Sequence, residues 1–229
     1  MTREIDVFAR NRAFWGMERQ ELLAGKSLFV AGMGALGCVV SEILVRSGIG
    51  EIVIADRGIV DPPDLNRQTL YTLNELGDSK VDCAANRLRI LTGQTRVVPA
   101  KVSIGDDDVA GLIAGCDGVA DCLDNFPSRF ALEDALPGGA FMVSGGLLGD
   151  YGQLTTILPG RTARLKDLFT RPGATEKTIP VTPPIVFAVG SFMAQEILDN
   201  LRGKPQLAGE ILAVGMSCIF TDRVPTGSP

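Results

Sequence analysis

The sequence feature that most constrains the fold is the glycine-rich segment GMGALG at residues 32–37. It follows an apolar run at residues 28–31 and opens a helical pattern over residues 35–47, after which residues 51–55 form a second apolar run. This order predicts a strand, a helix and a second strand, which close as a right-handed βαβ unit with parallel strands. Glycines at such a turn let the backbone approach a phosphate at the helix N-terminus. The cofactor-binding glycines that the segment predicts are Gly32, Gly34 and Gly37.

The same alternation of helical and apolar segments continues along the chain. Helices are expected at residues 78–91, 106–113, 128–136 and 185–201, and strands at residues 96–102, 118–123, 141–144, 153–158 and 210–221. Alternation of this kind predicts an α/β fold with a Rossmann-like, doubly wound and mostly parallel sheet. We expect the last two strands to be antiparallel.

The length of 229 residues predicts a single domain, with a helical segment at residues 1–26. Residues 159–184 are rich in proline, threonine and charge and have no clear periodicity. Loops of this length are usually functional, so we expect a mobile crossover loop there.

The composition excludes several classes of function. A net charge of -5 disfavours nucleic acid as a partner. The N-terminus lacks a signal-peptide pattern and no apolar run is long enough to span a bilayer, so we expect a cytoplasmic protein without a membrane partner. The chain has no histidine and five scattered cysteines without a C-x-x-C pair, so neither histidine catalysis nor a zinc site is expected.

Two polar segments follow the expected second strand. Asp56 ends that strand about 20 residues after the glycine turn, where an acid can hydrogen-bond a ribose hydroxyl. Residues 64–68, DLNRQ, come next in a loop at the expected carboxyl edge of the sheet. An arginine-bearing loop at that edge suits a polyphosphate, because ligands of doubly wound folds bind there. Lys80 stands at the start of the next helix, where a solvated surface charge is the alternative.

The segment DCLDNFPSR, residues 121–129, follows another expected strand. Asp124 is suited to binding magnesium, which uses one or two carboxylates together with phosphate oxygens and water; the alternative is an acid that caps the next helix. Arg129 belongs either to the site or to a surface salt bridge. Cys122 is interpreted as a buried packing residue, because a reactive thiol needs an exposed electropositive setting.

These motifs, in this order, resemble those of the family that includes ThiF, MoeB, HesA and the adenylation domains of ubiquitin-activating enzymes. The likeness rests on GMGALG, on Asp56 with DLNRQ, on Lys80, on DCLDNFPSR and on PPIVFAVGSFMAQEIL at residues 183–198, and it spans nearly the whole chain. It implies an ATP- and magnesium-dependent adenylyltransferase, a nucleotidyltransferase of cofactor biosynthesis that converts a carboxylate into an acyl-adenylate and pyrophosphate. The substrate it implies is the C-terminal glycine of a ubiquitin-like sulfur-carrier protein.

The resemblance also assigns residues to roles. FARNRAF makes Arg12 the arginine that reaches the ATP phosphates from a neighbouring subunit, which implies a homodimer. The catalytic residues are Arg12, Arg67, Lys80 and Asp124, with Asp124 as the magnesium ligand. The implied cofactor-binding residues, besides the glycines, are Asp56, Asp64, Asn66, Arg67, Gln68, Lys80, Asp124 and Asn125.

The sequence departs from the family pattern at several positions. Residues 159–184 contain no cysteine, so we expect no enzyme thioester. Asp64 stands where an asparagine is usual and Gly58 where a second acid is common. Three alternatives stay open at this point: adenylation of a small-molecule carboxylate, an NAD-dependent oxidoreductase and a non-catalytic nucleotide-binding scaffold. The sequence does not identify the carboxylate, the final acceptor, the sulfur source or the pathway.

Overall fold

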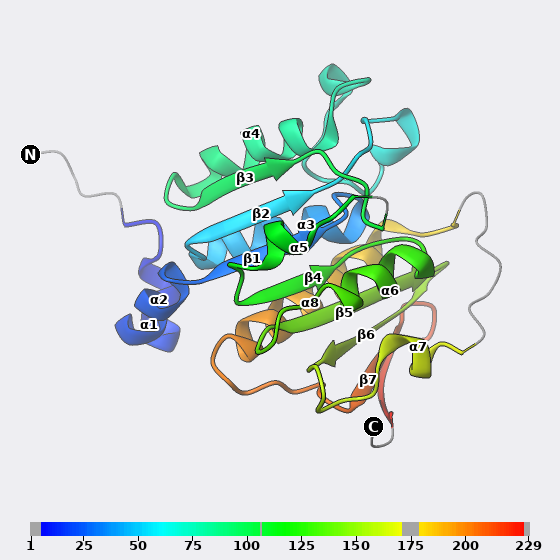
Figure 1. Ribbon diagram of the computed structural model, residues 1–229. Helices are drawn as coiled ribbons and strands as arrows, with labels where there is room; N and C mark the ends of the chain where they lie inside the picture. The colour runs from blue at the N-terminus through cyan, green and yellow to red at the C-terminus, as the bar shows by residue number, and fades with distance from the viewer. Residues whose placement is uncertain (1–5, 106, 171–178, 227–229) are drawn as a thin grey trace, which may run out of the picture.

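The computed structural model describes residues 6–105, 107–170 and 179–226. Within them, eight strands form one sheet in the order β3, β2, β1, β4, β5, β6, β7, β8 (Figure 1). Their bounds are β1 Ser27–Ala31, β2 Glu51–Ala55, β3 Arg96–Ala100, β4 Gly118–Asp121, β5 Phe141–Leu148, β6 Tyr151–Ile157, β7 Glu210–Gly215 and β8 Phe220–Pro225. The first five strands are parallel and the last three pair antiparallel. The predicted Rossmann-like sheet with late antiparallel strands is therefore confirmed.

Helices cover both faces of this sheet. Their bounds are α1 Ala9–Trp15, α2 Met17–Ala24, α3 Ala35–Ser47, α4 Lys80–Thr92, α5 Ala110–Ile113, α6 Phe126–Asp134, α7 Leu165–Leu168 and α8 Pro183–Asn200, with short 3₁₀ turns at η1 Pro62–Asp64 and η2 Leu73–Glu75. In Figure 1, α5 and α6 lie in front of the sheet, while α3 and α8 lie behind it. This three-layer arrangement leaves the carboxyl ends of the parallel strands open as a shared edge.

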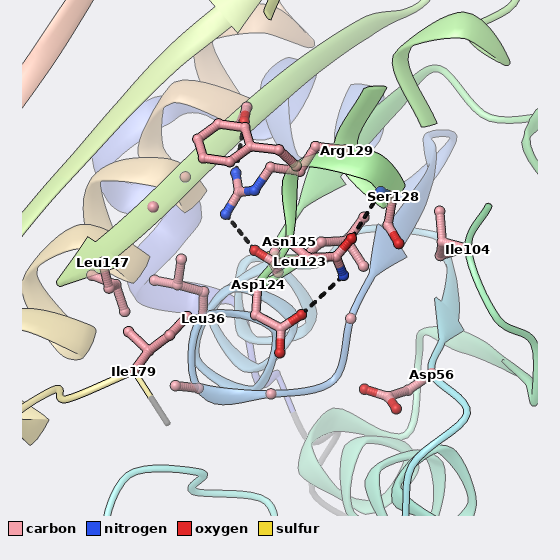
Figure 2. A pocket seen from close by; sticks show the side chains of 18 of the residues that line it. Leu36, Asp56, Ile104, Leu123, Asp124, Asn125, Ser128, Arg129, Leu147 and Ile179 are labelled. Atoms are coloured by element: carbon pink, nitrogen blue, oxygen red, sulfur yellow. Dashed lines mark hydrogen bonds between the residues drawn. The ribbon is translucent and has the colours of Figure 1, made fainter. Parts of the chain in front are cut away.

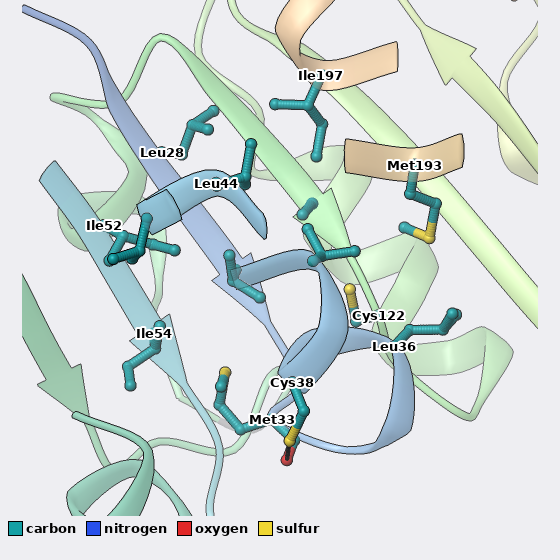
Figure 3. Packing of buried hydrophobic residues seen from close by; sticks show 14 of the residues in the cluster. Leu28, Met33, Leu36, Cys38, Leu44, Ile52, Ile54, Cys122, Met193 and Ile197 are labelled. Atoms are coloured by element: carbon teal, nitrogen blue, oxygen red, sulfur yellow. Dashed lines mark hydrogen bonds between the residues drawn. The ribbon is translucent and has the colours of Figure 1, made fainter. Parts of the chain in front are cut away.

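The larger hydrophobic core lies between the sheet and the helices behind it. Figure 3 shows Leu28 of β1, Ile52 of β2, Leu44 of α3 and Met193 of α8 in this cluster. These four side chains are fully buried. Strands buried on both faces are expected to be apolar throughout, which is why the first two strands were readable as continuous apolar runs.

Several predicted boundaries are corrected by the structure. The expected single strand at residues 210–221 is two strands, β7 and β8, because the chain turns between them and Ile219 adopts a positive φ of 43°. The expected helix at residues 106–113 is only the short α5, and Asp106 lies outside the described residues.

The predicted crossover loop at residues 159–184 also contains structure. It includes the short helix α7, and α8 begins two residues before the helix was expected to start. Residues 171–178 of the loop lie outside the described residues. The predicted mobility of the segment stays a prediction.

The expected N-terminal helical segment is two short helices, α1 and α2, separated at Gly16; residues 1–5 lie outside the described residues. Gln20 donates to the carbonyl oxygen of Ser47, where α3 ends, and Gly50 donates to that of Leu23 just before β2 begins. Both contacts lie at the amino-terminal edge of the sheet, so α1 and α2 cover the edge opposite to the carboxyl ends of the strands (Figure 1). Within the described residues, no helix is long and apolar enough to cross a bilayer.

Candidate active site

An open cleft of about 1430 Å³ runs along the carboxyl ends of the strands. Most of the predicted site residues lie in its wall: Gly32, Gly34, Asp56, Asp64, Arg67, Gln68, Lys80, Asp124 and Asn125. Three predicted residues are not part of that wall: Arg12, Gly37 and Asn66.

The glycine-rich turn connects β1 to α3 at one end of the cleft. Gly32 has a φ of +90°, and a Cβ atom on it would lie 2.8 Å from the carbonyl oxygen of Cys122. A Cβ on Gly37 would lie 1.9 Å from the carbonyl oxygen of Gly32, so this residue lets the first turn of α3 pack on the loop. Gly34 caps α3, and the backbone amides of the first helical turn have no partner within the helix. They form an anion-binding end of the kind that suits a phosphate.

Asp56 braces this turn from the end of β2. Its carboxylate accepts hydrogen bonds from the backbone amide of Met33 at 2.7 Å and from that of Gly58 at 2.6 Å. Each carboxylate oxygen has a further lone pair, so binding of a ribose hydroxyl by Asp56 is compatible with this geometry and stays a prediction. A Cβ on Gly58 would lie 3.0 Å from the Asp56 carboxylate, so the glycine accommodates a close approach.

The DLNRQ loop and the first residue of α4 each bring one cation to the cleft. Lys80 Nζ lies 2.9 Å from the Asp64 carboxylate and a guanidinium nitrogen of Arg67 lies 3.8 Å from it. The side chains of Lys80 and Arg67 are 13% and 22% exposed, so Lys80 is not the solvated surface charge that the sequence left open. Gln68 is buried and donates to Asp64 at 2.6 Å, whereas Asn66 is exposed and accepts from Arg67 at 2.9 Å.

Asp124 and Asn125 follow β4 on the opposite side of the glycine turn. Asn125, not Asp124, caps α6 by accepting from the Ser128 amide at 2.9 Å. Asp124 accepts a hydrogen bond from Asn125 at 3.2 Å and forms no ion pair within the described residues. Figure 2 shows its carboxylate in the cavity, with Asp56 to one side.

A buried network that the sequence analysis missed holds this loop. Asp121 is fully buried and accepts from Arg129 at 3.0 Å and from the Ser144 hydroxyl at 2.6 Å. Arg129 also donates to the backbone carbonyl of Leu123. Arg129 is therefore a half-buried partner of Asp121 in the wall of the cleft, not part of a surface salt bridge. An acid at the end of an apolar strand, with an arginine eight residues later, was the available signal, but its pairing with Ser144 depends on the sheet.

Cys122 lies directly after Asp121 in the chain and is buried as well. The residue is 9% exposed, and burial raises the pKa of its thiol well above the ordinary value. A raised pKa disfavours the nucleophilic thiolate. The interpretation of Cys122 as a packing residue agrees with both observations.

The far end of the cleft is apolar. Its wall includes Leu36, Leu147, Leu148, Tyr151 and Ile179. Figure 2 shows Leu36, Leu147 and Ile179 gathered on the side of Asp124 away from Asp56. This end was not predicted from the sequence, because its residues come from α3, β5, β6 and the crossover segment.

Arg12 is far from the cleft of its own chain. It lies in α1 at the amino-terminal edge of the sheet and forms an ion pair with Asp6. An arginine at that edge does not reach a ligand at the carboxyl edge of the same chain. Within the described residues, no group of three or more histidine, cysteine, aspartate or glutamate side chains is placed to hold a metal ion.

The fold and the cleft define the class: a Rossmann-like, doubly wound α/β protein with a glycine-rich turn at the carboxyl edge of its sheet. The chain belongs to the ThiF family, whose family model matches residues 8–217. This membership confirms the resemblance stated from the motifs.

Two curated relatives are adenylyltransferases by name. The chain is 30% identical to the molybdopterin-synthase adenylyltransferase of Escherichia coli (strain K12), over 89% of this chain and 84% of that protein. It is 32% identical to the sulfur carrier protein ThiS adenylyltransferase of Bacillus subtilis (strain 168), over 82% of this chain and 58% of that protein. The chain thus spans less than two thirds of the length of the second relative.

A solved structure of E. coli MccB with ATP has a similar fold. Its TM-score is 0.84, with 17% identity over 98% of this chain and 72% of that one. At this identity the comparison supports the fold alone.

Proposed function

We propose that this chain is an ATP- and magnesium-dependent adenylyltransferase that activates the C-terminal glycine carboxylate of a ubiquitin-like sulfur-carrier protein. The observation that carries the proposal is that one cleft gathers a glycine turn at a helix N-terminus, Arg67, Lys80 and the carboxylate of Asp124, which forms no ion pair within the described part of the chain. The named relatives, one of which acts on the sulfur carrier ThiS, support the same class of reaction. An NAD-dependent oxidoreductase is not favoured, since the polar DLNRQ loop has no role in hydride transfer.

The reaction needs positive charge more than proton transfer. A carboxylate oxygen attacks the α-phosphorus of ATP, the bond from that phosphorus to the bridging oxygen breaks, and pyrophosphate leaves with the electron pair. In this proposal the amides of α3 bind phosphate oxygens, and Arg67 and Lys80 offset the charge of the leaving pyrophosphate. No general base is required, because the attacking carboxylate is already ionised at neutral pH.

Asp124 fits the magnesium ligand. Its carboxylate lies in the cleft without a cationic partner among the described residues, and hard oxygen donors are what magnesium binds. When bound, the ion would supply further positive charge to the phosphate oxygens.

The open, apolar end of the cleft supports a protein tail as the substrate. An extended C-terminus could lie along Leu147 and Tyr151 with its carboxylate towards the phosphate end. The absence of cysteine between residues 159 and 184 supports release of the acyl-adenylate to a separate acceptor, without an enzyme thioester.

The same proposal places Arg12 in the site of a second copy of the chain. The residue lies at the wrong edge of the sheet to act in its own cleft, so a homodimer is the arrangement in which it reaches ATP. A cytoplasmic location stays a prediction.

ATP–pyrophosphate exchange tests the function directly. Exchange should require magnesium and a carrier protein ending in Gly-Gly, and Arg67→Ala and Asp124→Ala should each reduce it by at least about a hundredfold. If exchange occurred only with members of a panel of small carboxylic acids, the substrate would be a metabolite and not a carrier protein. Tight ATP binding without exchange in any of these reactions would indicate a scaffold and contradict the proposal.

A further inference from the structure

A buried carboxylate lies among the cations of the phosphate end. The Asp64 side chain is 11% exposed, and its two oxygens contact Lys80 at 2.9 Å and Gln68 at 2.6 Å. Arg67 lies 3.8 Å from the same carboxylate. The Asp64 carboxylate, which repels phosphate, therefore lies next to Lys80 and Arg67, which are expected to attract phosphate.

The carboxylate is held in place by its own loop. Asp64 accepts from the backbone amide of Asp61 at 3.1 Å, and the two residues form a reciprocal capping box around η1. Pro62 and Pro63 restrict the backbone of this turn. Lys80, by contrast, has a flexible four-carbon side chain with three donors, so it can contact Asp64 and a phosphate at the same time.

A carboxylate at this position has a structural cost. Because a carboxylate only accepts, Gln68 must direct its amide nitrogen towards Asp64, and the Gln68 amide oxygen is left buried with no donor among the described residues. A locally unfavourable choice of this kind is typical of positions retained for function.

We propose that Asp64 is an internal counter-ion that lowers the affinity of this cleft for the β- and γ-phosphates of ATP and for pyrophosphate. The inference rests on the proposed function. Arg67 and Lys80 together supply two positive charges, and Asp64 cancels one of them at a distance where little solvent screens the pair. Asp64 is thus a positioning and affinity-setting residue: it orients Lys80 and weakens the hold of the site on polyphosphate, including the leaving product.

The test is Asp64→Asn, which keeps the shape of the side chain and removes its charge. By isothermal titration calorimetry, the Kd for ATP and for pyrophosphate should fall about tenfold, while the Kd for AMP, which lacks the outer phosphates, should change less than about twofold. In the exchange assay the KM for ATP should fall in parallel. Thermal unfolding of the ligand-free variant is measured alongside, because removing the carboxylate leaves Lys80 without its ion pair and is expected to lower the stability.

Asp82→Asn is the matched control, since it removes the same charge from an exposed position on the helix that begins with Lys80. It should leave all three Kd values unchanged. A double-mutant cycle supplies an independent readout: in a Lys80→Met background, Asp64→Asn should tighten ATP by less than half of its logarithmic effect in the wild type.

The possible outcomes separate this inference from the proposed function. An unchanged or weaker ATP affinity in Asp64→Asn, or an equal gain in Asp82→Asn, would overturn the counter-ion role while leaving adenylation intact. A wild-type protein that binds no ATP would overturn both.

Discussion

Asp121 is a buried charge that fixes the position of the exposed loop that follows β4. It has no solvent contact, and its partners Arg129 and Ser144 come from α6 and β5. Arg129 also binds the carbonyl of Leu123, one residue before Asp124. The network therefore positions Asp124, the proposed magnesium ligand, through side chains that do not themselves need to contact the metal ion or ATP.

Removing the cation of this pair should destabilise the fold. Arg129→Met leaves the Asp121 carboxylate buried with only a hydroxyl and an amide, and we expect a loss of about 3–5 kcal/mol in the free energy of unfolding. Arg46→Met is the control, because the pair of Arg46 with Glu42 is solvent-exposed and should contribute less than about 1 kcal/mol. Urea unfolding measures both, and equal losses would contradict the assignment.

Alkaline pH should weaken the fold through Cys38. Burial raises the pKa of this thiol from 9.0 to about 12. Because the folded-state pKa is the higher one, the stabilisation is complete below pH 9 and is lost as the pH rises towards 12. Denaturant unfolding should therefore show a decline from pH 8 to pH 11, and Cys38→Ala should make that decline shallower. Val40→Ala, a buried truncation in the same helix, should lower stability at every pH without changing the slope.

The element that decides the geometry of the site is the turn from β1 into α3. The apolar run and the helical pattern predicted this turn correctly. The structure also explains why its last glycine is needed. Gly37 lies inside the helix, yet its hydrogen faces the Gly32 carbonyl so closely that no side chain fits. The motif thus packs a helix against its own loop as well as exposing amides to a ligand.

Gly37→Ala should therefore displace this turn. We expect a loss of stability of about 2 kcal/mol or more and at least tenfold weaker ATP binding, because the helix amides move with the loop. Gly111→Ala in α5 is the control, since its Cβ would meet nothing within 4 Å and its φ is not positive. That change should be neutral or slightly stabilising. Thermal unfolding and calorimetry would contradict the explanation if both variants behaved alike.

At the scale of the whole molecule, the positive charges of the proposed site are divided between two edges of the sheet. Arg67 and Lys80 lie in the cleft, and Arg12 lies at the opposite edge in contact with Asp6. If a second copy of the chain supplied Arg12 to the cleft, the position of Arg12 at the opposite edge would agree with the role that the family resemblance implies.

Subunit complementation tests that arrangement. Arg12→Ala and Arg67→Ala chains with different affinity tags are co-expressed, and the mixed dimer is purified. One of its two sites then contains both arginines, so about half of the wild-type exchange activity should return. A chain that has both substitutions, paired with itself, should stay inactive. A mixed dimer as inactive as either parent, or a monomeric protein, would contradict Arg12 acting across the interface.

The sequence by itself determined the βαβ unit, the order of most elements and the set of motifs at the carboxyl edge. These features depend on local periodicity and on turn chemistry, which neighbouring residues encode. It also placed Asp56, Lys80 and Asp124 correctly at strand and helix ends, because a parallel sheet brings those ends to one edge.

Only the tertiary structure decided how these residues pair. Asp64 contacts Lys80, Asp121 contacts Ser144, and the Met33 amide of the glycine turn contacts Asp56. Each pair is too far apart in the sequence for a local pattern to predict it. The apolar end of the cleft was missed for the same reason, because its residues come from separate segments of the chain. Such contacts follow from how packed elements approach one another, so their charges and distances emerge only when the sheet and its helices are assembled.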